Sequence, residues 1–199
     1  TILFEFFFFF FFWKQIMMEN NIPTSKFVSI RKDWNYSEIK ELKYPLVVKP
    51  VDSNGSKGVK KVENKDELNI YLEEAFRYSI SGDVIVEEFN EGEEVSIDVY
   101  VENSSVKLLS VISLNKIKQN KKSFTIVQSC YPPSFECDNT EVISIAQKIV
   151  DSFGLHDTPL LIQAIQTKEG LKVIEFSARM GGGSKFRSIE TFTGVNIMN

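Results

Sequence analysis

The fold is decided by residues 160–184, which read LLIQAIQTKEGLKVIEFSARMGGGS. Two apolar runs in this stretch, 160–166 and 171–177, flank a turn at Gly170. Runs of this length around a glycine turn predict two antiparallel strands joined as a hairpin. The sequence therefore predicts a hairpin that is followed directly by an arginine and three glycines.

Gln163 and Glu175 fall on the two predicted strands. Their oxygens are able to converge on one hard cation such as Mg²⁺, which prefers oxygen ligands. Arg179 follows the acid by four residues, and its planar guanidinium suits a phosphate or a carboxylate. The glycines at 181–183 leave the backbone open to a substrate. The alternative is a buried Glu–Arg pair with a structural role.

A second cluster lies upstream, where the strand LVVKP at 46–50 leads into the loop DSNGSKG at 52–58. Lys49 closes the strand, and a second strand, GVKKV, follows the loop, so the two strands form a hairpin. Glycines let backbone N–H groups approach an anion and lysines neutralise it, which suits a polyphosphate. The loop matches neither GxxxxGK[ST] nor GxGxxG. An ordinary polar hairpin turn is the alternative.

A third cluster is the acidic stretch VEEFNEGEE at 86–94. Most charge runs are solvated faces, and a solvated acidic turn is one interpretation. However, Glu87 and Glu88 close an otherwise buried strand. Exposed backbone at such a strand end can hydrogen-bond a planar base, and Glu94 can hold a ribose hydroxyl.

Hydrophobic periodicity predicts three helices and two further strands. The helices are expected after the capping residues Asn64 and Glu67, from Thr140 after Asp138 and Glu141 to Gly154, and over 184–192 before Gly194. The strands cover 95–101, whose alternation indicates a half-exposed antiparallel sheet, and 106–114. The fold class is therefore α+β, with two lobes that divide near residue 86.

The order and spacing of these clusters resemble the ATP-grasp superfamily of carboxylate-amine ligases, in particular the ATP-binding domains of the carbamoyl-phosphate synthetase large chain and biotin carboxylase. The resemblance covers 14–199 and rests on four stretches in the family's order: YPLVVKPVDSNGSKGV, VIVEEFNEGEEVS, LLIQAIQ and VIEFSARMGGGS. It implies an ATP-grasp fold in which two α+β lobes, about 22–86 and about 87–199, clasp ATP between largely antiparallel sheets.

The resemblance also assigns roles to individual residues. It implies that Lys57 and Arg179 support catalysis, and that Mg²⁺ or Mn²⁺ is held by Gln163, Glu175 and Ser177. It implies an ATP-binding set made of the following residues: Lys49, Ser53, Gly55, Ser56, Lys57, Gly58, Glu87, Glu88, Phe89, Asn90 and Glu94. Ser177 departs from the family, which usually has Asn there, and this puts a second metal site in question.

The activity implied is an ATP-dependent ligase, in which a small-molecule carboxylate becomes an acyl phosphate that an amine captures to form a C–N bond. Two alternatives stay open: an ATP-grasp phosphotransferase, and a nucleotide-binding module without catalysis. The family normally has another α/β domain before this one and continues beyond TGVNIMN, so we expect an ATP-grasp core rather than a whole enzyme.

Composition limits the possible partners. The 199 residues carry 23 basic and 27 acidic side chains, for a net charge of −4, and 43% of them are hydrophobic. This balance is typical of a folded globular protein. An acidic chain argues against nonspecific nucleic-acid binding, and no apolar run reaches the roughly 20 residues that span a bilayer. We expect no nucleic-acid or membrane partner and a cytoplasmic location.

The first thirteen residues are anomalous and receive no function. Eight of the 17 phenylalanines lie between Thr1 and Phe12, seven of them consecutively from Phe6. A run of thymines read through at the start of an open reading frame would produce this tract. The alternative is a real buried helix or anchor.

Three types of residue are expected to lie outside the chemistry. His156 is interpreted as structural, as are the two cysteines, which have no CxxC spacing and suit a reducing compartment. The lysines of the loop that follows residue 114 are expected to be solvated, with a lid over the triphosphate as the alternative: Lys116, Lys118, Lys121 and Lys122.

Overall fold

The computed structural model describes residues 9–53, 57–116, 126–182 and 185–197, with side chains from Trp13 onward. These residues form two compact units. Unit 1 comprises the described residues of 1–16, 25–90 and 116–125, and unit 2 those of 17–24, 91–115 and 126–199. Helix α2 (Phe9–Glu19) precedes both sheets in the chain. Its first four residues are the last four phenylalanines of the anomalous tract.

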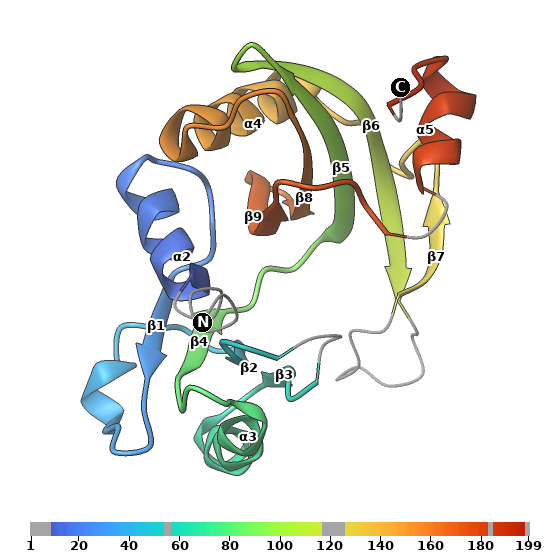
Figure 1. Ribbon diagram of the computed structural model, residues 1–199. Coiled ribbons are helices and arrows are strands. Elements are labelled where there is room, and N and C mark those ends of the chain that lie inside the picture. The colour runs from blue at the N-terminus through green and yellow to red at the C-terminus, as the bar shows by residue number, and fades with distance from the viewer. Residues whose placement is uncertain (1–8, 54–56, 117–125, 183–184, 198–199) are drawn as a thin grey trace. The chain divides into compact units, whose positions relative to one another are not determined.

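Unit 1 contains a four-stranded antiparallel sheet in the order β1-β4-β2-β3 (Figure 1). Its strands are β1 (Phe27–Ile30), β2 (Leu46–Pro50), β3 (Lys60–Val62) and β4 (Val84–Glu88). The 3₁₀ helix η1 (Tyr36–Glu38) follows β1. β2 and β3 pair directly, which confirms the hairpin predicted around the glycine-containing loop.

Helix α3 (Lys65–Tyr78) covers this sheet (Figure 1). It begins as predicted, because the Asn64 side chain accepts a hydrogen bond from the Glu67 N–H at 3.0 Å. The Glu67 carboxylate accepts from the Glu63 N–H at 3.1 Å. The apolar face of α3 packs into a core with strand residues, and its buried members are Leu68, Leu72, Ala75 and Phe76.

Unit 2 contains a five-stranded sheet in the order β7-β6-β5-β8-β9. Its strands are β5 (Glu93–Glu102), β6 (Ser105–Lys116), β7 (Ile126–Cys130), β8 (Thr158–Thr167) and β9 (Gly170–Ser177). β8 and β9 pair antiparallel, which confirms the hairpin that decided the fold. The pairing carries an irregularity between Gln163 and Ala164.

Helix α4 (Asn139–Phe153) starts and ends as predicted, with Asp138 accepting from the Thr140 N–H at 2.8 Å and Gly154 at φ 60°. The predicted role of Glu141 at the helix start is wrong, because its carboxylate accepts the Leu171 N–H at 3.0 Å instead. That bond ties α4 to β9. Gln147 ties α4 to the β5–β6 turn, beside which the helix lies in Figure 1.

The centre of β5 is buried on both faces. Val95, Ile97 and Val99 are buried as the alternation predicts, but Ser96 and Asp98 are each only 4% exposed. The expectation of a half-exposed sheet is therefore wrong here, because a lysine of the last helix covers the polar face. That helix, α5 (Lys185–Thr193), ends before Gly194, as predicted.

Candidate functional site

In unit 1, a buried ion cluster joins helix α2 to two adjacent strands. Glu87, on β4, lies between two lysines. Its Oε2 is 2.5 Å from Lys14 Nζ, and its Oε1 is 2.7 Å from Lys49 Nζ. The side chains of Lys14 and Glu87 are 1% and 8% exposed. One carboxylate therefore serves two cations, and these three side chains together carry a net charge of +1.

The shared carboxylate shifts the titration of its neighbours. Burial opposes ionisation of Glu87, but the two lysines outweigh it and lower its pKa from 4.5 to about 2. Burial is the main reason that the pKa of Lys14 is lowered from 10.5 to about 8. Repulsion from Lys49 lowers it further, and the attraction and hydrogen bond of Glu87 offset these effects only in part.

Sequence reasoning missed Lys14. The residue lies in helix α2, between the phenylalanine tract and the turn at Asn20, in a stretch for which no site was predicted. A single lysine among apolar residues of that helix, Trp13, Ile16 and Met17, was the available signal. Its partner could not be found from the sequence, because 73 positions separate Lys14 from Glu87.

The predicted phosphate loop is fixed at both ends. The Asp52 carboxylate accepts hydrogen bonds from the Ile80 and Ser81 N–H groups at 3.0 and 2.5 Å. Ser53 Oγ donates to the Lys57 carbonyl at 2.8 Å, and the Lys57 side chain is exposed. Predicted binding residues Gly55 and Ser56 lie outside the described residues, as do Lys118, Lys121 and Lys122.

Gly58 closes this loop in a conformation that requires glycine. Its φ is +73°, and a Cβ at this position would lie 2.9 Å from side-chain atoms of both Pro50 and Tyr78. The glycine therefore allows the backbone at this position to lie close against Pro50, the last residue of β2.

The predicted base-binding segment, 87–90, uses the amides of Glu88 and Phe89 for hydrogen bonds within unit 1. The Glu88 N–H donates to the Lys26 carbonyl and the Phe89 N–H to the Pro45 carbonyl, each at 2.9 Å. Asn90 Nδ2 donates to Ser25 Oγ at 2.6 Å. These donors hold the segment in place, so a base would have to use other groups of the segment.

In unit 2, the predicted metal ligands lie on neighbouring strands. Gln163 of β8 is directly opposite Glu175 of β9 and also opposite Ser96 of β5. Opposite residues of an antiparallel pair share a face and have Cβ atoms about 5 Å apart. Ser177 lies on the next row of the same face, opposite Leu161. Glu175 is exposed, and the structure brings this predicted set together on one face.

The donor set of this face suits a hard cation. It offers one carboxylate from Glu175, one amide oxygen from Gln163 and one hydroxyl from Ser177. Mg²⁺ is commonly bound by one or two carboxylates together with substrate phosphates and water. Among the described residues, no group of three or more His, Cys, Asp or Glu is placed to hold a metal, so a cation here needs further oxygen ligands.

Arg179 follows β9 on an exposed turn. Its backbone N–H donates to the Ser177 carbonyl at 2.8 Å, and its Nη1 donates to the Met180 carbonyl at 2.9 Å. Glu94, the predicted ribose ligand, is half-buried on the face that carries Gln163 and pairs with Ile165.

A second residue that sequence reasoning missed is Lys185. Its Nζ lies 2.8 Å from Asp98 Oδ2 and donates to Ser96 Oγ at 2.5 Å. Ser110 Oγ also donates to Asp98, at 2.9 Å. The signal in the sequence was two polar residues, Ser96 and Asp98, in the middle of an apolar strand.

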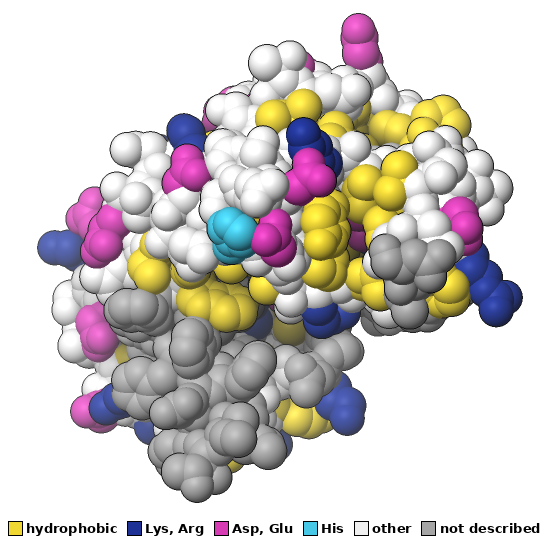
Figure 2. All heavy atoms as spheres, turned by 45° about the horizontal axis from the view of Figure 1, so that its top comes forward, with side chains coloured by type: hydrophobic (Ala, Val, Ile, Leu, Met, Phe, Trp, Pro, Cys, Tyr) yellow, Lys and Arg dark blue, Asp and Glu magenta, His cyan; other side chains and the backbone are white. Residues whose placement is uncertain are grey.

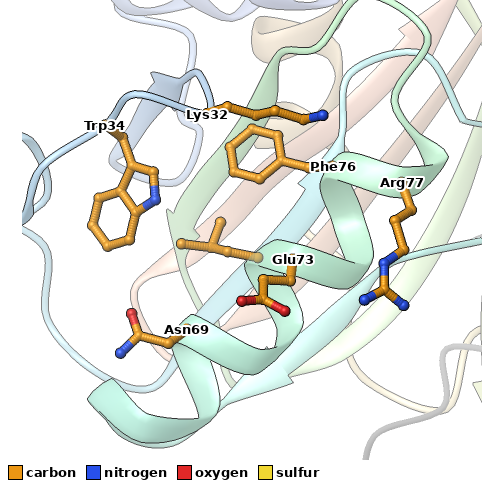
Figure 3. Close-up of a pocket in the computed structure, with 7 residues that line it drawn as sticks. Lys32, Trp34, Asn69, Glu73, Phe76 and Arg77 are labelled. Atoms are coloured by element: carbon orange, nitrogen blue, oxygen red, sulfur yellow. The ribbon is translucent and has the colours of Figure 1, made fainter.

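A hollow of about 510 Å³ lies elsewhere in unit 1, between α3 and the segment after β1 (Figure 3). The side chains that line it are Lys32, Trp34, Asn69, Leu72, Glu73, Phe76 and Arg77. None of the predicted site residues is among them, so this hollow is not the candidate site.

Comparison with known families shows which family the chain belongs to. The model of the D-ala D-ala ligase C-terminus matches residues 16–155. The chain belongs to this family. The D-alanine–D-alanine ligase of Bacillus anthracis is 35% identical over 103 residues, which cover 51% of this chain and 32% of that protein. The chain therefore spans about a third of the length of this relative.

Solved structures show the same fold as this member of the D-ala D-ala ligase C-terminus family. The D-alanine–D-alanine ligase of Bacillus anthracis complexed with ATP has a TM-score of 0.72 at 22% identity, covering 91% of this chain and 58% of that one. The biotin carboxylase domain of the Hydrogenobacter thermophilus 2-oxoglutarate carboxylase has a TM-score of 0.75 at 22% identity, covering 92% and 42%. The resemblance to the ATP-grasp superfamily and the α+β fold class are confirmed.

The surface of this family member has mixed charge. Figure 2 shows acidic and basic side chains interspersed with apolar ones over the drawn face. Within the described ranges, no helix has the length and apolar character needed to cross a membrane.

Proposed function

We propose that this chain is the ATP-binding core of a carboxylate-amine ligase, which forms a C–N bond at the expense of ATP. The observation that carries the proposal is the direct pairing of Gln163 with Glu175, followed by Arg179, in a chain of this family. The proposal is further supported by relatives named as D-alanine–D-alanine ligases and by a similar structure described as an ATP complex.

Unit 1 would supply the nucleotide ligands. The surplus positive charge of Lys14, Lys49 and Glu87 supports a role in holding phosphate, since a buried net charge of +1 favours an anion. The strand end at 87–90 would hold the base. The remaining proposed ligands in unit 1 are those of the loop, Ser53, Gly55, Ser56, Lys57 and Gly58. Glu94, in unit 2, would hold the ribose.

Unit 2 would supply the cation ligands Glu175, Gln163 and Ser177. When bound there, Mg²⁺ or Mn²⁺ would neutralise developing negative charge on the phosphates. Arg179, which has an exposed guanidinium, would hold the transferred phosphoryl group or the acyl phosphate, and Lys57 would assist it. The chain's residues therefore act by positioning and charge, and no side-chain nucleophile is needed.

The substrates would be a small-molecule carboxylate and an amine, and the lobes would be about 22–86 and about 87–199. Cys130 and Cys137 are free thiols, which supports a reducing, cytoplasmic location. The substrates, the lobe boundaries and the location are parts of the proposal.

The test measures ADP release by the chain with Mg·ATP and candidate carboxylates, with and without an amine. We expect Glu175→Ala to abolish turnover and leave the fold intact, because Glu175 is exposed. Glu169→Ala, an exposed acid in the turn of the same hairpin, is the matched control and should keep full activity.

Full activity in Glu175→Ala would show that the metal assignment is wrong. Phosphorylation of an alcohol that needs no amine would replace the ligase proposal with a phosphotransferase. Binding of Mg·ATP without turnover would indicate a module without catalysis.

A further inference from the structure

Lys185 crosses from helix α5 to the centre of the unit 2 sheet. Its ammonium is bound by Asp98 and Ser96, both buried on β5, and its side chain is 17% exposed. Asp98 is in turn bound by Ser110 of β6. A lysine and an aspartate that are both largely removed from water fix each other's position, because separating them would leave a buried charge without a partner.

The contact is made on a particular row of the sheet. Asp98 of β5 pairs with Leu161 of β8, which pairs with Ser177 of β9. Ser177 is the last residue of β9, and Lys185 is the first of α5. Ser177, where the segment that carries Arg179 begins, thus lies on this row, and the Lys185 side chain reaches the same row two strand spacings, or about 9.5 Å, away.

Gly181 shows how closely this segment lies against the lysine. A Cβ at Gly181 would lie 2.2 Å from Lys185 Cδ, closer than atoms can approach. A Cβ at the neighbouring Gly182 would meet nothing within 4 Å. The two glycines therefore differ: the first leaves room for the lysine stem, which a Cβ would displace, and the second faces open space.

We propose that Lys185 is a positioning residue, which holds the segment from Ser177 to Gly182 so that Arg179 is fixed relative to Gln163 and Glu175. This inference rests on the proposed function. Lys185 touches neither nucleotide nor substrate in this role and acts through Arg179. Its ion pair with Asp98 fixes the lysine in place. The close packing of Gly181 against the lysine stem then fixes the segment that carries Arg179.

A purely structural role predicts something different. α5 buries Ile189, and its Phe192 ring stacks on Tyr131 at 4.1 Å, so the helix has other attachments to unit 2. If Lys185 only held the helix, its loss would lower stability and leave the chemistry of the folded protein unchanged. If it positions Arg179, the loss of Lys185 should impair the same step as the loss of Arg179.

The experiment compares three variants of the full chain. Two are the single variants Lys185→Met and Lys185→Arg, and the third, called the charge-free pair, is the double variant that combines Asp98→Asn and Lys185→Met. The pair removes both buried charges, so it stays folded if the single variant does not. Two readouts are taken on folded protein: kcat and KM for ATP, and the affinity for Mg·ADP with aluminium fluoride, a stand-in for the transferred phosphoryl group.

We expect kcat to fall about 10- to 100-fold with little change in KM, since misplacing a group that acts in the transition state costs this much. Affinity for the aluminium fluoride complex should fall in parallel. Lys185→Arg should restore most of both. Adding Lys185→Met to Arg179→Met should cause little further loss, because the two residues act on one step.

Gly181 gives an independent test. Gly181→Ala should reduce kcat and aluminium fluoride affinity in the same direction, whereas Glu190→Ala, at an exposed position of the same helix as Lys185, should leave both unchanged. The inference is overturned if Lys185→Met, or the charge-free pair, binds the aluminium fluoride complex as tightly as the unsubstituted chain. It is also overturned if the double variant of Lys185→Met and Arg179→Met loses kcat by the product of the two single losses. If the unsubstituted chain fails to bind Mg·ATP at all, it is the proposed function that fails.

Discussion

Units 1 and 2 each bury an ion cluster on a sheet, but the balance of charge differs. In unit 1, one carboxylate, Glu87, serves the two cations Lys14 and Lys49. In unit 2, one cation, Lys185, serves one carboxylate, Asp98, with serine hydroxyls completing the set. The first cluster carries a surplus positive charge, and the second is neutral.

The difference separates a cluster suited to binding from one suited to positioning. Burying charge costs folding free energy, and the pKa of Lys14, lowered mainly by burial and further by Lys49, is a sign of that cost. An anionic ligand would remove the cost. A neutral pair gains nothing from an added anion, but it holds two elements at a fixed distance. The comparison can be tested by removing charges from each cluster.

The largest effect is expected for Glu87→Gln. The substitution leaves two buried lysines facing a neutral amide, and breaking a buried ion cluster in this way costs about 3–5 kcal/mol of unfolding free energy. Chemical denaturation at pH 7 measures it. Glu88→Gln is the control, because the Glu88 carboxylate is only half-buried and accepts one backbone N–H, that of Lys43, at 3.0 Å. A loss below about 1 kcal/mol for Glu87→Gln would contradict the surplus-charge account.

The second prediction is a gain of stability at alkaline pH from Lys14. Its pKa is about 8 when folded and 10.5 as a free side chain. Between these values the unfolded chain binds a proton that the folded chain does not, so the unfolding free energy rises with pH. The gain is up to about 3 kcal/mol between pH 7 and 10.5.

Denaturation curves at several pH values measure this gain, and Lys14→Met is the control that should lack it. Glu87 affects the unfolding free energy at acid pH. Because its pKa is lowered from 4.5 to about 2, the stability it contributes is lost as the pH falls through this range. A Lys14→Met protein with the same alkaline rise as the unsubstituted chain would show that the rise comes from another group.

These clusters mark the limit of what the sequence predicts. The hairpin that brings Gln163 opposite Glu175 follows from two apolar runs around a glycine turn, and the structure confirms it. The partners of Lys14 and Lys185 lie 73 and 87 positions away along the chain, at Glu87 and Asp98. Periodicity reports which face of an element is apolar and does not identify the distant side chain that covers its polar residues.

The same limit explains two incorrect expectations. Glu141 has the spacing of a helix cap, but the Leu171 amide, 30 positions away, competes for its carboxylate. The alternation in β5 predicts exposure of Ser96 and Asp98, but α5 brings Lys185 over them. In both cases a long-range contact overrides a correct local pattern.

A smaller effect separates the neutral cluster of unit 2 from that of unit 1. Lys185→Met should cost about 3 kcal/mol, because Asp98 is left buried with a hydroxyl as its remaining partner. Adding Asp98→Asn removes the unpaired charge, so the double variant should recover to within about 1 kcal/mol of the unsubstituted chain. Thermal or chemical unfolding measures both. If the double variant were as unstable as the single one, the cluster would not be a balanced pair.

The smallest effect is expected for Glu94→Ala, which tests whether binding extends from the surplus charge of unit 1 to an acid of unit 2. A carboxylate that accepts a ribose hydroxyl contributes about 1–1.5 kcal/mol, so the Kd for Mg·ATP should rise about 5- to 10-fold. Calorimetry measures it, with the exposed Glu91→Ala as control. The folded stability should change little, because Glu94 is only half-buried. An unchanged Kd would confine nucleotide binding to the lysines and strand end of unit 1, whereas an equal change in both variants would indicate general electrostatics rather than a ribose contact.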